Sequence, residues 1–302
     1  TDMAFFYAMK DVKLKRDKLA AFGSTRRAKN KPEDDPNLQT LLEADTPVVT
    51  IFGKSWMLHV EVVLKVSGKQ NLTMVEDSCQ FLKDHGKEVI FDAEHFFDGY
   101  NDNREYALSV LDAAVKGGAE TIVLCDTNGG LLPLDIQRIC TEVRARLPEH
   151  VELGIHVHND SDCAVANSIA AVQSGCTHVQ GTINGIGERC GNANLCSIIS
   201  GLELKAGYSC LPKGSLKHLT ELSHFVYDLA NMRPATHQPY TGISAFAHKG
   251  GMHVNAVQKN PTTFEHIEPQ TVGNERRILV SDLSGGTNIM MKAAEHDVHL
   301  DQ

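Results

Sequence analysis

EVIFDAEHFFDGYNDNREYALSVLDAAVKGGAETIVLCD, residues 88–126, is the stretch that decides the fold of this chain. Its two ends, residues 88–92 and 121–125, are short runs rich in apolar and β-branched residues, which predict strands. Between them, residues 104–116 place apolar side chains three and four positions apart, as an amphipathic helix does, and Gly117 supplies a helix C-cap. A strand, a helix and a second strand in so short a span indicate a βαβ unit with parallel strands.

The same alternation of strand and helix continues on both sides of this unit. The further strand candidates are residues 19–23, 48–52, 151–157 and 178–183, and the further helix candidates are residues 72–85, 134–147 and 163–174. Strand starts recur roughly every 30 residues, which fits a TIM (β/α)₈ barrel as well as a doubly wound α/β sheet.

Polar residues come directly after the apolar part of each strand candidate. A barrel explains this arrangement, because its active site is built at the carboxyl ends of several strands. A doubly wound sheet would instead concentrate the site at one switch point, and no GxGxxG follows the first strand candidate. We therefore expect residues 1–211 to form a partial TIM-barrel catalytic domain. Residues 212–302, with a helix candidate at 216–230 and glycine-containing stretches after it, are expected to form a small α-rich lid or linker subdomain.

Bulk composition favours a globular protein that acts on small molecules. The 302 residues are 42% hydrophobic and carry a net charge of −9, and the basic cluster at residues 10–31 is followed at once by Glu33, Asp34 and Asp35. Nucleic-acid and membrane binding are therefore not expected. The eight cysteines include no CxxC pair, and no signal peptide or long apolar run is present, which indicates a cytoplasmic protein.

A pair of histidines, His156 and His158, stands in the sequence GIHVHND. On a strand, two residues separated by one point to the same face, so both imidazoles can converge on one divalent metal. The alternative is two ordinary histidines placed so by coincidence. The following loop, residues 184–194, carries Glu188 and Asn192 among glycines that allow close backbone approach to a ligand, although a solvated glycine-rich turn would look the same.

HVHNDSDCAVANS (156–168) together with GTINGIGERCGNANL (181–195) resembles a signature region of the isopropylmalate/homocitrate/citramalate synthase family. The resemblance extends over essentially the whole chain, through FDAEHFFDGY, VLCDTNGGLLP, FAHKGGMHVNAV and VGNERRILVSDLSG, and these stretches are most similar to the citramalate synthase branch. The family has a TIM barrel followed by a lid.

The resemblance implies a metal site at His156, His158 and Asn192, completed by an Asp that follows the family's first strand. That Asp, and the Arg beside it that binds the oxo acid, would precede Thr1. The six strand candidates would then be the third to the eighth of the barrel, so we expect a chain that lacks about the first two strands. An inactive truncated fragment is accordingly one alternative.

Further roles follow from the same resemblance. Thr127 would hydrogen-bond the oxo-acid carboxylate, although a polar residue at a helix start would look alike. Glu94 and Glu188 are the candidate acid/base residues, between which the sequence does not choose, and either would serve equally as a structural ion-pair partner. His253 would be the lid histidine that reaches the active site of the partner subunit, with His248 as its competitor.

Two positions bear on this assignment in other ways. Phe264 stands where relatives commonly carry a tyrosine, so a phenolic hydroxyl expected to assist the chemistry is absent. Arg26, beside Arg27, is a candidate for binding the phosphates of coenzyme A, with a solvated basic rim as the alternative.

The implied reaction is the metal-dependent condensation of acetyl-CoA with a 2-oxo acid, in the citramalate branch pyruvate to (R)-citramalate for isoleucine biosynthesis. Acceptors of isopropylmalate and homocitrate synthases remain alternatives, because pocket size decides the acceptor. A 3-hydroxy-3-methylglutaryl-CoA lyase would share the fold, but the lid motifs argue against it. The resemblance further implies a homodimer and Mg²⁺, Mn²⁺ or Zn²⁺ as the metal.

Overall fold

The described part of the chain folds as two units, each of which is considered by itself. The structure, a computed structural model, describes residues 2–279, 290 and 293. The first unit comprises the chain to Gly181 together with Gly187–Ala193, and the second comprises Thr182–Ile186 and the chain from Asn194. The domain boundary near residue 211 stays a prediction, as does the predicted extent of the second domain, part of which lies outside the described residues.

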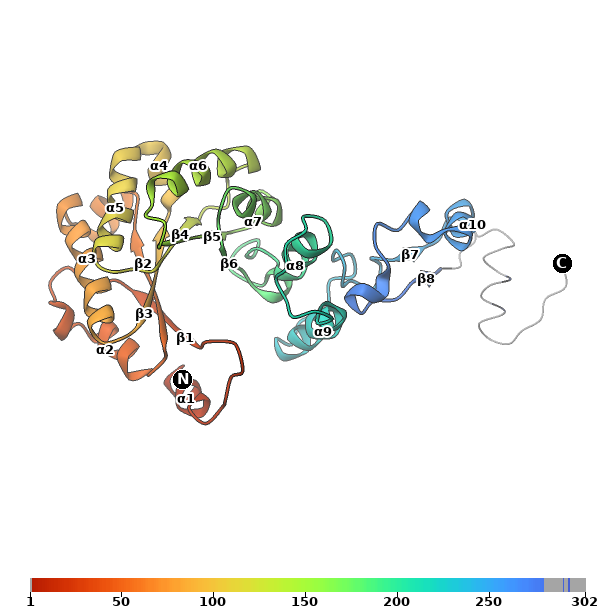
Figure 1. Cartoon of the computed structure of the whole chain (residues 1–302), viewed down its shortest axis with the longest axis horizontal. Coiled ribbons are helices and arrows are strands. Elements are labelled where there is room, and N and C mark those ends of the chain that lie inside the picture. The colour runs from red at the N-terminus through yellow and green to blue at the C-terminus, as the bar shows by residue number, and fades with distance from the viewer. Residues whose placement is uncertain (1, 280–289, 291–292, 294–302) are drawn as a thin grey trace. The chain divides into compact units, whose positions relative to one another are not determined.

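The first unit is built on a parallel sheet in which every strand pairs with the next one in the sequence (Figure 1). Its six strands are β1 (Ala20–Ser24), β2 (Val48–Lys54), β3 (Glu88–Glu94), β4 (Thr121–Asp126), β5 (Glu152–Val157) and β6 (His178–Gln180). This sequential order is that of a curled barrel wall and has no switch point, so the prediction of a barrel over a doubly wound sheet is confirmed.

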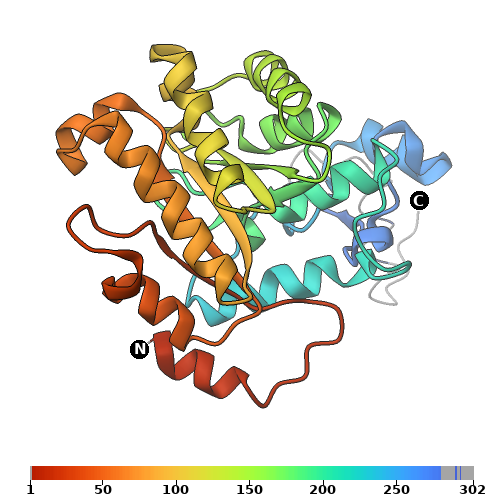
Figure 2. The ribbon, with the colours of Figure 1, turned by 60° about the vertical axis from the view of Figure 1, so that its left-hand side comes forward.

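Helices follow the strands in the order that the sequence predicts. The helices of this unit are α1 (Asp2–Met9), α2 (Pro36–Glu43), α3 (Gly68–Asp84), α4 (Phe96–Asp102), α5 (Arg104–Lys116), α6 (Pro133–Arg146) and α7 (Ala164–Gln173). The predicted helices correspond to α3, α5, α6 and α7. Helix α3 packs on β2 and β3, and α5 packs on β3 and β4. Both helices lie in front of the strands in the view of Figure 2.

Three helices of this unit, α1, α2 and α4, were not predicted. The start of α2 nevertheless has a helix N-cap signal in the sequence. Asp35 is its N-cap, and the carboxylate accepts hydrogen bonds from the backbone N–H groups of Asn37 and Leu38. Pro36 then occupies the first helical position, where its missing N–H costs nothing. Only Leu38 and Leu41 of α2 are buried, so the apolar spacing that predicts the other helices is weak in this acidic and polar segment.

Alternation along the strands gives the sheet two different faces. The face under the helices is apolar and fully buried as far as Asp126 at the end of β4, and it includes Val49, Ile51, Val89, Phe91, Ala93, Ile122, Leu124, Leu153, Ile155 and Val157. Burying side chains of this size stabilises the fold by roughly 1.5–3 kcal/mol each. The other face carries the intervening residues, including Asp92, Glu94 and His156, and it is more open, since Phe22 is 63% exposed.

The sixth strand is shorter than the sequence suggested. The prediction extended it to residue 183, but β6 ends at Gln180. Residues Ile183–Gly185 form a 3₁₀ turn instead, in which Asn184 has φ = 67°. A residue in the left-handed region cannot continue a strand, and Asn is among the few that adopt it at low cost.

The second unit is small and mostly helical. It contains α8 (Leu195–Leu204), α9 (Leu219–Leu229), α10 (Gly251–Lys259) and the short parallel pair β7 (Ala247–His248) and β8 (Arg277–Ile278). A core of five buried residues holds it together: Cys196, Leu216, Leu219, Phe246 and Val272. The predicted helix at 216–230 is present as α9 with a 3₁₀ turn before it. Residues 280–285 of the last family-like stretch lie outside the described residues.

None of the helices in the described ranges is long and apolar enough to cross a membrane.

Helix α4 meets the loop after β2 so closely that position 99 has no room for a side chain. A Cβ at Gly99 would lie 2.3 Å from the carbonyl oxygen of Ser55. Gly99→Ala should therefore lower the free energy of unfolding by about 1–3 kcal/mol, even though alanine favours a helix by up to about 1 kcal/mol over glycine. Urea denaturation measures the change. Gly130→Ala is the control, because nothing lies within 4 Å of a Cβ there, and equal stability of the two variants would contradict the contact.

Candidate functional site

The open face of the sheet ends in a pocket at the carboxyl ends of its strands. Its volume is about 300 Å³. It is lined by Phe22, Phe52, Asp92, Glu94, Cys125, Thr127, His156, His158, Glu188 and Asn192. Six of the predicted site residues, contributed by separate segments of the first unit, are thus brought to one place. Pockets of this size, with a few polar groups among apolar walls, are typical small-molecule sites.

The histidine pair lies at the end of β5 with its rings turned toward each other. Nε2 of His156 is 3.3 Å from Nε2 of His158, and the ring centroids are 5.2 Å apart. Burial lowers the pKa of both imidazoles, and the hydrogen bond to Gln180 opposes this for His156. The rings are therefore neutral near pH 7, which is the form that binds metal ions.

The loop of residues 187–193 runs alongside the end of β5 and brings Asn192 to the histidines. His158 and Asn192 form an antiparallel bridge, and the N–H of Ala193 donates to the carbonyl of Val157 over 3.0 Å. Gly187 is required for this approach, since a Cβ there would lie 2.4 Å from Nδ2 of Asn192. The register of the loop therefore places an amide beside two imidazoles.

Two buried polar atoms at this point have no hydrogen-bond partner among the described residues. They are Oδ1 of Asn192 and Nδ1 of His158. A buried acceptor without a donor costs about 1–3 kcal/mol, so its presence indicates a ligand. The described chain has no cluster of three or more His, Cys, Asp and Glu side chains that fits a metal ion. Two imidazole nitrogens and an amide oxygen nevertheless suit a divalent cation, so the residues present fit the implied metal.

Behind His156 lie two residues that the sequence analysis did not single out. Nδ1 of His156 is 2.8 Å from Oε1 of Gln180, and Nε2 of Gln180 donates to Oδ1 of Asp92 over 2.8 Å. Asp92 is only 4% exposed, and this burial raises the pKa of its carboxyl group to about 7, against the effect of the Gln180 hydrogen bond. Strand alternation was the available signal, because Asp92 precedes Glu94 by two residues.

The two candidate acid/base residues have different surroundings. Glu94 is partly buried at the end of β3, and Lys54 at the paired position of β2 donates to its carboxylate. Glu188 is exposed on the loop of residues 187–193. Its neighbour Arg189 binds Asp160 instead, with Nε 2.8 Å from Oδ1. The ion pair with Lys54 is compatible with a structural role for Glu94 as well as a catalytic one. Glu188 takes no part in the ion pair between Arg189 and Asp160.

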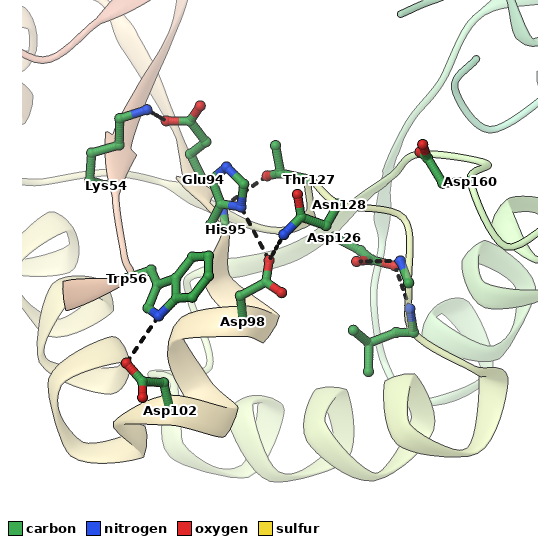
Figure 3. A network of polar contacts seen from close by, with 12 residues as sticks. Lys54, Trp56, Glu94, His95, Asp98, Asp102, Asp126, Thr127, Asn128 and Asp160 are labelled. Atoms are coloured by element: carbon green, nitrogen blue, oxygen red, sulfur yellow. Dashed lines mark hydrogen bonds and ion pairs between the residues drawn. The ribbon is translucent and has the colours of Figure 1, made fainter. Parts of the chain in front are cut away.

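Thr127 is held in place by the segment that follows Glu94 (Figure 3). The backbone N–H of His95 donates to its Oγ1 over 2.8 Å, which leaves the hydroxyl hydrogen available to donate. Asp98 fixes this arrangement from below, because its Oδ2 lies 3.1 Å from Nδ1 of His95 and accepts from Nδ2 of Asn128 over 3.1 Å. His95 itself has φ = 57°, a left-handed conformation that the surrounding bonds hold.

Asp126 closes the loop that carries Thr127. Its carboxylate accepts from the N–H groups of Gly130 and Leu131 over 3.3 and 3.1 Å, as the dashed lines in Figure 3 show. The carbonyl of Thr127 accepts from Arg189 over 2.7 Å. Two loops that the sequence treats separately are thus joined at the pocket. Figure 3 also shows Trp56, whose Nε1 donates to Asp102 over 3.0 Å on the other side of this network.

Arg26 is held inside the first unit by its own neighbours. Its Nε and Nη2 donate to the carboxylate of Asp77 over 2.8 and 2.7 Å, and Nη1 donates to the carbonyl of Asn30 over 2.9 Å. Its side chain is only 10% exposed. A role for Arg26 in binding coenzyme A stays a prediction, and it would require this ion pair to open.

The two histidines proposed as competitors in the second unit differ sharply. His248 is buried and its Nε2 lies 3.0 Å from Glu265, which also receives a bidentate pair of hydrogen bonds from Arg276. His253 is exposed on α10 and stacks on Phe264, with ring centroids 4.1 Å apart. His248 is therefore engaged in contacts within this unit, whereas the ring of His253 is exposed, and its role in the chemistry stays a prediction.

Comparison with known proteins gives a consistent set of matches. The HMGL-like family model matches residues 32–226, and the model described as homocitrate synthase post-HMGL domain-like matches residues 240–302. The (R)-citramalate synthases of Geobacter sulfurreducens and Aquifex aeolicus are each 55% identical over 300 residues, which is 99% of this chain. The chain covers 56% and 57% of their lengths, little more than half.

Among solved structures, the Bacillus subtilis HMG-CoA lyase superposes on 76% of this chain and 76% of its own, with a TM-score of 0.63. The two sequences are 18% identical over that match, so the likeness concerns the fold alone.

Asp92 provides a test of the buried carboxyl group. Its pKa is about 7 in the folded chain, against an ordinary value of 3.8, so the folded state binds the proton more tightly. The cost of ionisation is therefore absent below pH 4, grows between pH 4 and pH 7, and is constant above. Because each pH unit corresponds to about 1.4 kcal/mol, Asp92→Asn should raise the free energy of unfolding by about 3–4 kcal/mol at pH 8, and by less at pH 5.

Urea denaturation in EDTA at the two pH values measures this difference. The control is Asp17→Asn, at an exposed position, for which no difference between the two pH values is expected. Destabilisation by Asp92→Asn at both pH values would show that the carboxylate stabilises the fold.

Proposed function

The chain belongs to the HMGL-like family, and from this premise we propose that it condenses acetyl-CoA with pyruvate to give (R)-citramalate and free coenzyme A. One observation carries the proposal: His156, His158 and Asn192 meet Glu94, Glu188 and Thr127 around a single pocket. Identity of 55% with two (R)-citramalate synthases across 99% of the chain supports pyruvate as the acceptor.

His156, His158 and Asn192 would hold a divalent metal ion, Mg²⁺, Mn²⁺ or Zn²⁺. When bound, such an ion acts as a Lewis acid that polarises the carbonyl group of the oxo acid. The neutral imidazoles and the unpaired amide oxygen are the groups that support this assignment.

Thr127 would orient the oxo acid. Its oxygen already accepts from the backbone of His95, so its hydrogen is free to donate to the substrate carboxylate. Because the hydroxyl is fixed by this bond and by the strand end, it can position the carboxylate without a conformational change.

Glu94 is our proposed general base, which removes a proton from the methyl group of acetyl-CoA. Lys54, at the paired position of β2, holds the carboxylate of Glu94 in a fixed place at the pocket. Its position at the end of β3 is rigid, whereas Glu188 lies on an exposed loop, where we propose an orienting role.

The remaining assignments rest on the sequence. The resemblance supports our proposal that His253 assists the chemistry from the lid of a partner subunit in a homodimer, and that the enzyme serves isoleucine biosynthesis. We further propose that Arg26 contributes to the binding of coenzyme A, because a guanidinium group binds phosphate, and that the protein is cytoplasmic, because its cysteines include no CxxC pair.

Release of coenzyme A thiol from acetyl-CoA, followed with a thiol reagent in the presence of Mg²⁺ or Mn²⁺, tests the reaction. We expect release with pyruvate and much less with 2-oxoisovalerate or 2-oxoglutarate. His156→Ala should abolish it, because one imidazole ligand is lost, whereas His150→Ala, in an exposed loop before β5, should not. Absence of release with every acceptor would contradict catalysis by this chain.

The choice of base can be tested separately. Glu94→Gln should lower kcat by about 10²–10⁴-fold, because it keeps the shape but not the basicity of the side chain. Glu188→Gln should have a smaller effect. Steady-state rates with pyruvate distinguish the two, and the reverse order of effects would move the base to Glu188.

A further inference from the structure

We propose that Asp92 and Gln180 form a relay that fixes His156 as the tautomer protonated on Nδ1, so that its unprotonated Nε2 faces His158. This assignment rests on the proposed function and deepens it, because it gives the metal site two positioning residues that act through His156.

The relay crosses the open face of the sheet. Gln180 and His156 occupy paired positions of β6 and β5, whereas Asp92 belongs to β3, three strands away from β6. The row of residues between them includes Gly154, where a Cβ would lie 2.9 Å from Val123 and 3.1 Å from His178. The missing side chain at this position is replaced by the side chains of Val123 and His178, which pack beside the relay.

The direction of the relay follows from the donors and acceptors. In its ionised form, above its pKa of about 7, the carboxyl group of Asp92 only accepts hydrogen bonds, so it orients the amide of Gln180 with its NH₂ group toward Oδ1, at 2.8 Å. The carbonyl oxygen of Gln180 then faces Nδ1 of His156, also at 2.8 Å, and an oxygen requires a donor there. Nδ1 therefore carries the hydrogen, and Nε2 keeps its lone pair.

The Nε2 atom of His156 is the one that the site needs. It lies 3.3 Å from Nε2 of His158, in the part of the pocket that also contains the unpaired Oδ1 of Asn192. If the amide of Gln180 were reversed, Nδ1 would accept and Nε2 would carry the hydrogen, which would block metal binding through that atom.

A purely structural role explains Asp92 poorly. A carboxylate that is 4% exposed loses its hydration, and the hydrogen bond from Gln180 returns only part of that free energy. An apolar side chain of similar size would stabilise the fold more. The position is costly for stability, and orienting the hydrogen bonds of His156 supplies a reason for that cost.

The experiment reads the tautomer of His156 in the metal-free chain. In a ¹⁵N-histidine-labelled sample at pH 8 with EDTA, where Asp92 is ionised, long-range ¹H–¹⁵N correlations show which ring nitrogen carries the hydrogen, and His156→Ala assigns the signal. We expect Nδ1–H in the wild type. In Gln180→Met, which has similar length and no hydrogen bonds, we expect this tautomer to lose its dominance. Gln180→Glu should restore it, because a carboxylate oxygen again accepts from Nδ1.

Affinity for Mn²⁺ alone, measured by titration calorimetry, is the second readout. We expect Gln180→Met to bind about 10–100-fold more weakly than the wild type, with Gln180→Glu closer to the wild type. The matched control is Gln238→Met in the second unit. Gln238 is also a buried bridge, which accepts from Tyr227 and donates to Thr241, each over 2.7 Å. Its loss should lower stability and leave the His156 signal and Mn²⁺ affinity unchanged.

Asp92→Asn keeps the relay testable if Gln180→Met does not fold. Asparagine can donate as well as accept, so it should permit both amide orientations and give a mixture of His156 tautomers. The proposal would be overturned if the Nδ1–H tautomer were as dominant in Gln180→Met and in Asp92→Asn as it is in the wild type. If the wild type binds no Mn²⁺ or releases no coenzyme A, the proposed function fails, while the tautomer spectra still decide the relay.

Discussion

The register between neighbouring parallel strands is the constraint on which this site depends. Because paired residues point to the same face, Lys54 meets Glu94, and His156 meets Gln180. A shift of one residue in any strand would turn its polar side chains under the helices and its apolar ones into the pocket. The fully buried apolar face, from Val49 to Val157, fixes this register and so fixes the chemistry on the opposite face.

Stability and function make opposite demands at the strand ends. The helix-covered face is apolar as far as Asp126 at the end of β4, whereas the open face contains a buried carboxyl group at Asp92 and its pocket an unpaired amide oxygen at Asn192. His95 and Arg189 adopt left-handed conformations in the loops around the pocket. Each of these features lowers the stability of the fold, and the packing of the surrounding structure compensates for it.

Much of this arrangement was predictable from the sequence, and the residues that escaped did so for physical reasons. The strands stood out because apolar runs alternate with amphipathic segments, and His156, His158 and Asn192 stood out because they fall in recognisable motifs. Helix α4 was not predicted because its N-cap residue, His95, has a left-handed conformation. This conformation follows from the contacts of His95 with Thr127 and Asp98. The contact between Asp92 and Gln180 was not predicted, because only the folded sheet brings β3 and β6 close enough for it.

The buried carboxyl group of Asp92 has a consequence for anyone who engineers this chain. A screen that selects only for thermal or chemical resistance favours variants in which an unfavourable buried group has been removed, and the carboxyl group of Asp92 is such a group. The improved variants would be soluble and well folded, yet their His156 would have lost the partner that sets its orientation. Selection for robustness therefore needs a simultaneous readout of metal affinity.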